Sequence, residues 1–105
     1  MNGDPGLTVG LTVIEDLVCL AALEVPGVAR VGHGGPSWHG WIAGPPVRVS
    51  VRDGAVTLRL TIVARPAQPL IPLVAAVRAG VAAAIHRLLA LDLVSLTVVV
   101  DGVGA

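Results

Sequence analysis

The sequence of 105 residues lacks phenylalanine, tyrosine and lysine, and it contains one cysteine and two tryptophans. Hydrophobic residues still make up 54% of the chain, so we expect an aliphatic core of Val, Leu, Ile and Ala. The single cysteine, Cys19, excludes an internal disulfide framework and is typical of a protein from a reducing cytosol.

The formal net charge of the chain is zero, because the seven arginines equal the seven acidic residues in number. Strong overall attraction to nucleic acid is therefore not expected. The first ten residues carry no basic segment, so no signal peptide is predicted. The most apolar window, residues 70–91, contains Arg78, His86 and Arg87, which favours a core helix over a membrane span. A chain of this length holds one modest core, so we predict a single domain over residues 1–105.

Residues 47–65 read VRVSVRDGAVTLRLTIVAR, two alternating runs joined by Asp53-Gly54. Asp-Gly is a preferred pair for a two-residue type I′ turn, because both central residues need a positive φ. Such a turn fixes which residues face each other across the two strands. The predicted pairs are Arg52 with Ala55, Val51 with Val56, Ser50 with Thr57, Val49 with Leu58, and Arg48 with Arg59.

The N-terminal part predicts a frayed tail (residues 1–6), a short strand at Leu7–Leu11 and a helix capped by Thr12. Pro26-Gly27 would end this helix, and 28–31 would form a short strand. The helix would bury one stripe: Ile14, Leu17, Val18, Ala21 and Val25. Residues 32–46, rich in Gly and Pro, read as a surface loop.

The C-terminal part predicts a long helix over about 70–90 and a last strand at Val94–Val100. The helix stripe expected inside is Leu70, Val74, Val77, Val81, Ala84, Ile85 and Leu88. The strand is expected to turn Val94, Leu96, Val98 and Val100 inward.

These elements predict an α+β fold, with a small sheet of three to five strands around a central antiparallel hairpin and two helices packed on one face. The helices would cover the valine face of the hairpin. The other face, which carries the arginines, would stay open.

Three arginines, Arg48, Arg52 and Arg59, are therefore the first candidates for partner binding. Arg48 and Arg59 are expected directly opposite each other, which is unfavourable for like charges. The row is either a solvated face, a contact for an acidic partner or neighbouring subunit, or a nucleic-acid surface. Because no aromatic side chain shares this face to stack bases, nucleic acid is the least favoured of the three.

The loop contains the second group of candidates, Trp38 and Trp41, together with His33 and His39. The two tryptophans would either fold back as a lid over the core or be exposed as a contact site. Two histidines without a nearby cysteine or carboxylate do not predict a metal site. The alanine-rich outer face of the long helix is either a consequence of helix propensity or a packing surface for another subunit.

No catalytic arrangement is predicted. Ser37 does not lie in a G-x-S-x-G turn, and no acid is placed to orient a histidine. Cys19 has no cationic neighbour that would activate its thiol. We therefore predict no enzyme activity and no cofactor.

The segment Ala21–Val28, AALEVPGV, resembles the A-x-x-E-V-x-G-V signature of the alkaline-shock, or envelope stress response, proteins of Gram-positive bacteria. The hairpin, the helix opened by Ile71-Pro72 and the last run, LDLVSLTVVVDGV, resemble the second half of that family in order and spacing. The resemblance extends over residues 8–103. It implies a small non-catalytic cytoplasmic protein of envelope homeostasis, which self-associates and lies beneath the cell membrane through a membrane-protein partner. A small nucleic-acid-binding domain that uses the arginine face is the alternative.

Overall fold

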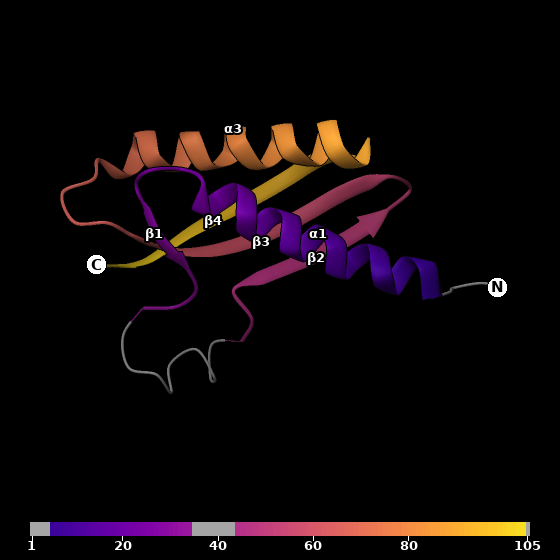
Figure 1. The fold of residues 1–105 in the computed structure, drawn as a ribbon, viewed down its shortest axis with the longest axis horizontal. Helices are drawn as coiled ribbons and strands as arrows, with labels where there is room; N and C mark the ends of the chain where they lie inside the picture. Colours follow the sequence, from indigo (N-terminus) through magenta and orange to yellow (C-terminus); the bar gives the residue numbers. More distant parts are fainter. Residues whose placement is uncertain (1–4, 35–43, 105) are drawn as a thin grey trace.

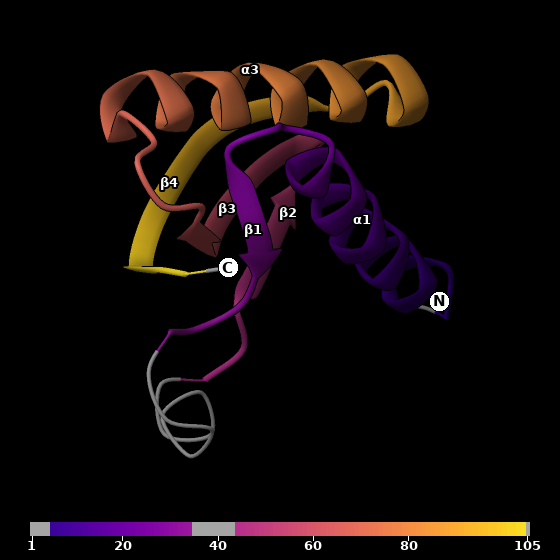
Figure 2. The same ribbon diagram turned by 60° about the vertical axis from the view of Figure 1, so that its left-hand side comes forward.

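The computed structural model describes residues 5–34 and 44–104, which form two helices and four strands (Figure 1). The elements in order are α1 (Pro5–Leu23), β1 (Val28–Val31), β2 (Val47–Arg52), β3 (Ala55–Ala64), α3 (Leu70–Leu89) and β4 (Asp92–Val103). The predicted α+β fold is confirmed, with one sheet and both helices on one of its faces (Figures 1 and 2).

The hairpin of β2 and β3 has the predicted register throughout, from Arg52 opposite Ala55 to Arg48 opposite Arg59. The turn residues Asp53 and Gly54 have φ angles of 53° and 77°. Two positive φ angles are the signature of the type I′ turn, whose twist matches that of the flanking strands. This short turn therefore sets the position of every side chain on the two strands.

Strand β3 is the centre of the sheet. Along one edge it pairs with β4 in parallel, and along the other it pairs antiparallel, first with β2 and then with β1. The change from β2 to β1 takes place at Thr61, whose N–H donates to the Pro46 carbonyl (2.8 Å) and whose carbonyl accepts from Gly32 (3.0 Å). The segments on both sides of the loop are thus fixed to the same residue of β3.

The core lies between the sheet and the helices. From β3 the side chains of Val56, Leu58, Leu60 and Ile62 are at most 1% exposed. α1 and α3 pack side by side (Figure 2), and at Gly80 a methyl group would lie 3.9 Å from the Ala21 carbonyl oxygen. The helix residues that complete the core are Ile14, Val18, Ala21, Ala22, Leu73, Val77, Val81, Ala84 and Ile85.

The first helix is longer than predicted. α1 begins at Pro5, so the predicted strand at Leu7–Leu11 and the predicted cap at Thr12 are wrong. The predicted frayed tail is wrong at residues 5–6, and residues 1–4 lie outside the described chain. The alternating residues 7, 9 and 11 were ambiguous, because residues 7, 11, 14 and 18 also have the spacing of one helix face.

In the C-terminal half of the chain, the predictions of which side chains point into the core were partly wrong for α3 and for β4. In α3, Leu70 is 43% and Leu88 is 58% exposed, whereas Leu73, which was not predicted, is 4% exposed. A helix that is apolar nearly all round gives no clear phase to hydrophobic periodicity. In β4, Val94 is 63% exposed because Val56 pairs with Leu93 and Thr57 with Ser95, which leaves Val94 as the extra residue of a bulge.

The segment Glu24–Val28 is the tight connection between α1 and β1. The Gly27 carbonyl accepts from the N–H of Arg65 at 2.9 Å, which holds the turn to the end of β3. A methyl group at Gly27 would lie 2.6 Å from Gln68 Oε1 and 2.7 Å from Leu73 Cδ1. The side chains of Gln68 and Leu73 would have to shift to admit a larger residue, because α3 and its leading loop pack directly on this backbone.

Candidate functional site

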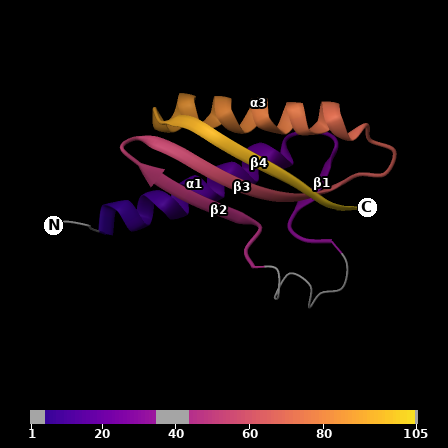
Figure 3. The ribbon, with the colours of Figure 1, turned by 180° about the vertical axis from the view of Figure 1, so that it is seen from behind.

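The face of the sheet opposite the helices carries the arginines. Seen from behind, the strands lie in front of the helices (Figure 3). Arg48, Arg52 and Arg59 are exposed, as predicted, and Arg48 lies directly opposite Arg59. We call this side of the sheet the arginine face.

One end of the arginine face is covered, which corrects the prediction of a fully open surface. Thr61 is only 5% and Val63 only 3% exposed, although they share this face with Arg59. Gly32 and Pro46 flank Thr61 through backbone hydrogen bonds, His33, Pro45 and Asp101 lie around its side chain, and Gly104, just after β4, lies beside Val63. The polar side chains of His33 and Asp101 therefore lie near Arg48 and Arg59, and Thr61 lies where the two groups meet.

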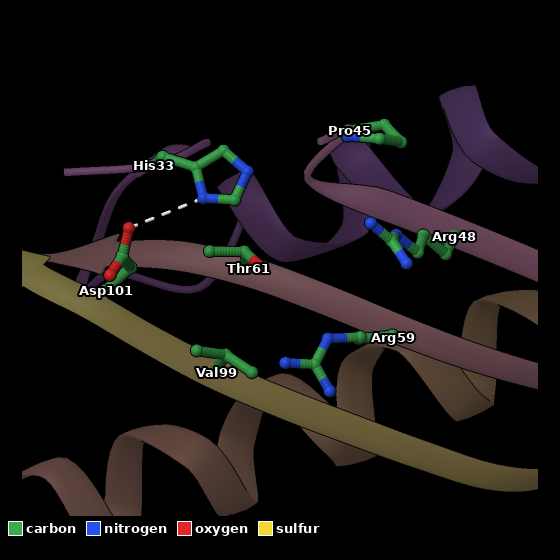
Figure 4. A pocket seen from close by; sticks show the side chains of 7 residues that line it. All are labelled: His33, Pro45, Arg48, Arg59, Thr61, Val99 and Asp101. Atoms are coloured by element: carbon green, nitrogen blue, oxygen red, sulfur yellow. Dashed lines mark ion pairs between the residues drawn. The ribbon is translucent and has the colours of Figure 1, made fainter. Parts of the chain in front are cut away.

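A cavity of about 170 Å³ lies where the open and covered parts meet. Figure 4 shows the side chains around it. The guanidinium groups of Arg48 and Arg59 extend in the same direction along their strands, toward Thr61. The lining residues are His33, Pro45, Arg48, Arg59, Thr61, Val99 and Asp101.

His33 and Asp101 form the far wall of this cavity. His33 Nε2 donates to the Gly44 carbonyl oxygen at 2.7 Å, and Nδ1 lies 3.4 Å from Asp101 Oδ2. The same carboxylate oxygen accepts from the Gly34 N–H at 3.0 Å. The His33 carbonyl accepts from Arg30 Nη1 at 3.1 Å. These contacts tie both ends of the loop to β4 and hold the wall in place.

Two glycines are part of the same wall. A methyl group at Gly34 would lie 2.1 Å from the Asp101 carbonyl oxygen, so only glycine fits there without a shift of the backbone. At Gly44, φ is 89° and a methyl group would lie 2.6 Å from Arg48 Nη2. The guanidinium of Arg48 therefore rests against the backbone at Gly44.

The described part of the chain brings together no group of three or more His, Cys, Asp or Glu side chains suited to a metal. His33 and Asp101 make two such side chains, fewer than a structural metal site uses. What the cavity offers instead is two guanidinium groups and one hydroxyl, all hydrogen-bond donors.

The sequence predicted part of this site. Arg48 and Arg59 were named, whereas Arg52 lines a separate hollow with Ser50, Asp53, Ala55 and Thr57. Thr61 and Asp101 were missed, although alternation along β3 already placed Thr61 on the arginine face. The candidates Trp38, His39 and Trp41 lie outside the described residues.

Cys19 lies on α1, away from the arginine face, and its side chain is partly buried. Burial, and then the negative charges of Asp16 and Glu15, raise the pKa of this thiol above its ordinary value of 9.0. The thiolate is therefore scarce near neutral pH, in agreement with the expectation of an unreactive cysteine.

α3 exposes a large apolar surface. By length and composition it is the one helix in the described ranges that would be able to cross a membrane, with a mean hydropathy of 1.4. Its inner stripe belongs to the core, but only 28% of the stretch is buried. Ile71 is 86% exposed, and Leu70 and Leu88 are also largely exposed.

Comparison with known proteins gives likeness of fold alone. No family model matches the chain, and no curated protein matches it. Among solved structures it is similar to MamM CTD, the C-terminal domain of a cation diffusion facilitator. A doubly substituted form is 19% identical (TM-score 0.68, 92% of this chain and 99% of that chain). A zinc form is 20% identical, with a TM-score of 0.68 over 92% of this chain and 90% of that chain. A copper form is 20% identical, with a TM-score of 0.64 over 88% of this chain and 96% of that chain.

Proposed function

We propose that this protein is a non-catalytic interaction domain that self-associates and acts in envelope homeostasis near the membrane, with a membrane-protein partner. The observation that carries the proposal is the outer surface of α3, which is largely apolar and yet exposed, with Arg78, His86 and Arg87 as its polar residues. The membrane partner and the envelope role are supported by the resemblance of residues 21–28 and of the C-terminal half to the alkaline-shock proteins.

The exposed side of α3 has the composition of a packing surface. Ile71 and Leu88 lie near its two ends, and the alanines between them, at 75, 79 and 83, are exposed. Small side chains allow a second helix to approach closely, and large exposed apolar patches mark interaction sites. A second copy of the chain would offer the same surface, so a two-fold pair of α3 helices would cover both.

The likeness to MamM CTD, a domain of a larger protein, is a likeness of fold. The titles of those structures include zinc, copper and manganese forms. No metal role is proposed here, because the described residues lack a matching ligand group.

The test of self-association is light scattering over a wide range of protein concentration. We expect dimers or larger species that dissociate on dilution, and a shift to monomer for Ile71→Glu, which places a charge on the apolar surface. Leu20→Glu is the matched control, because Leu20 is exposed on α1. A wild-type protein that stays monomeric at every concentration contradicts the proposal, as does an equal effect of the two variants.

The alternative is a small nucleic-acid-binding domain, favoured by the three exposed arginines on one face of the sheet. It predicts binding of single-stranded oligonucleotides that weakens steeply with salt, because counterions are released from the phosphates. The double variant Arg48→Ala/Arg59→Ala would lower the affinity and reduce the salt dependence. Absence of binding at low salt would eliminate this alternative.

A further inference from the structure

The side chain of Thr61 carries a buried hydroxyl without a hydrogen-bond partner in the described part of the chain. The residue is 5% exposed, and its backbone N–H and carbonyl are used by Pro46 and Gly32. Within residues 5–34 and 44–104, no group forms a hydrogen bond with its hydroxyl. Figure 4 shows this oxygen turned toward the side of the cavity where the arginines lie. Because buried polar groups are nearly always satisfied by protein, ordered water or a ligand, this hydroxyl is a donor available to an atom that enters the cavity.

Arg48 and Arg59 supply the charge for such a ligand. They face each other directly across β2 and β3, an arrangement that is unfavourable for like charges. An anion between two guanidinium groups turns this repulsion into charge-assisted hydrogen bonds. No ion pair reaches Arg59 from the part of the chain that the structure describes.

Asp101 also lines the cavity, and its negative charge has to be considered. Its Oδ2 accepts from the Gly34 N–H and faces His33 Nδ1, so this oxygen is already engaged by the wall. In Figure 4 it lies on the far side of Thr61 from both arginines. An anion held by the arginines is therefore placed at the opposite end of the cavity from this carboxylate.

We propose that this cavity binds the phosphoryl group of a small molecule, held by Arg48 and Arg59 with the Thr61 hydroxyl as a third donor. The volume of about 170 Å³ is similar to the ~150 Å³ of a cavity that admits benzene, so a phosphoryl group fits. The three donors come from two strands, Arg48 from β2 and Arg59 and Thr61 from β3, and a tetrahedral anion has enough oxygens to accept from all three. A planar carboxylate would be satisfied by one bidentate arginine and would leave Thr61 unpaired.

The site goes beyond self-association and does not depend on it, because α3 lies on the other side of the sheet. It also differs from a surface for a nucleic-acid strand. The wall of His33 and Asp101 closes one end, and among the described residues that line the cavity His33 is the one aromatic ring on which bases would stack. The phosphoryl group would come from a free phosphate, a soluble phosphate monoester or a lipid headgroup.

The experiment is an NMR titration of the isotope-labelled full chain with inorganic phosphate, with sodium chloride at equal ionic strength as the reference. We expect saturable shifts at the backbone amides of residues 33, 59 and 61, and small shifts at Arg52. Shifts that do not saturate, or that chloride reproduces, would overturn the proposal. So would equal shifts at Arg52, since that result means general attraction to basic side chains.

Three variants sharpen the test. Arg59→Gln should weaken phosphate binding by about tenfold, because a charge-assisted hydrogen bond is lost. Thr61→Val should weaken it several-fold, and Arg52→Gln, the matched control, should leave it unchanged. The amide spectrum of each variant shows whether it is folded. If Arg59→Gln, an exposed position that the fold does not need, binds phosphate like the wild type, the assignment is wrong.

Further probes identify the source of the phosphoryl group. Glycerol 3-phosphate that binds more tightly than inorganic phosphate indicates a soluble monoester. Vesicles with phosphatidic acid that bind while phosphatidylcholine vesicles do not, with loss in Arg59→Gln, indicate a lipid headgroup. A single-stranded oligonucleotide that binds when neither phosphate nor any monoester does would contradict a small-molecule site.

Discussion

The two faces of the sheet differ although the same strand supplies both. On β3, Leu58, Leu60 and Ile62 point into the helix layer and are at most 1% exposed, whereas Thr57 and Arg59, which alternate with them on the other face, are exposed. Burying a leucine contributes about 1.5–3 kcal/mol, whereas a surface ion pair contributes about 0–1 kcal/mol. Alternation along one strand thus separates the residues that stabilise the fold from those available for recognition.

This division has one exception, at the covered end. Thr61 belongs to the arginine face by its position, but it is as buried as a core residue. The cover is held by hydrogen bonds of His33, Gly34 and Asp101, not by the hydrophobic layer. Stability and recognition should therefore be coupled at this end and independent elsewhere.

The largest expected effect is on the inner face. Leu60→Ala should lower the free energy of unfolding by about 2–5 kcal/mol, because it leaves a cavity at a site that is fully buried. Its neighbour Arg59→Ala should change stability by less than about 0.5 kcal/mol. Urea denaturation followed by circular dichroism measures both. Similar losses for the two variants would break the distinction between the faces.

A smaller loss is expected at the covered end. Gly34→Ala places a methyl group 2.1 Å from the Asp101 carbonyl oxygen, so the backbone must shift, at a cost of about 1–3 kcal/mol. The measurement is the midpoint of thermal unfolding.

Gly10→Ala is the matched control for this change. Gly10 lies in α1 with nothing within 4 Å of the added methyl group, so the substitution should stabilise the helix by about 0.5–1 kcal/mol. A Gly34→Ala protein as stable as Gly10→Ala would show that the loop is not held against β4.

The smallest effect concerns Cys19, on a helix that covers the inner face. Burial and the carboxylates of Asp16 and Glu15 raise the pKa of the thiol above 9.0, so the folded state favours the protonated form. This contribution to stability is complete below the pKa of the unfolded thiol and is lost as pH rises through the folded value. Alkylation by iodoacetamide, followed by mass spectrometry, should be slower in the native than in the urea-unfolded protein at about pH 8.

The control is Cys19 in the unfolded chain at each pH. Equal rates in native and unfolded protein at neutral to mildly alkaline pH would mean that the thiol is not shielded. The helix layer would then be more open than the structure shows.

The hairpin was predictable from the sequence because its cause is local. Asp53-Gly54 selects the turn, the turn sets the register, and the alternating valines leave no second register with an apolar face. The short strand at 28–31 and the long helix were also found from local breaks at Pro26-Gly27 and Pro66–Pro69.

The remainder depends on contacts between distant residues. The parallel pairing of β4 with β3 and the shared edge of β1 and β2 place His33, Thr61 and Asp101 together. No local sequence pattern predicts that these three residues lie close together. The phase of α3 was missed for another reason, since apolar residues on every side fit several stripes equally well.

The most direct test of the central claim is Arg59→Gln, measured for both stability and phosphate affinity on the same sample. The claim predicts a urea midpoint equal to or above that of the wild type, because removal of the like-charge pair gains at most about 0.5 kcal/mol, together with phosphate binding that is about tenfold weaker. A variant that loses stability along with binding, or that keeps wild-type binding, would contradict the division between a face that folds the chain and a face that recognises a ligand.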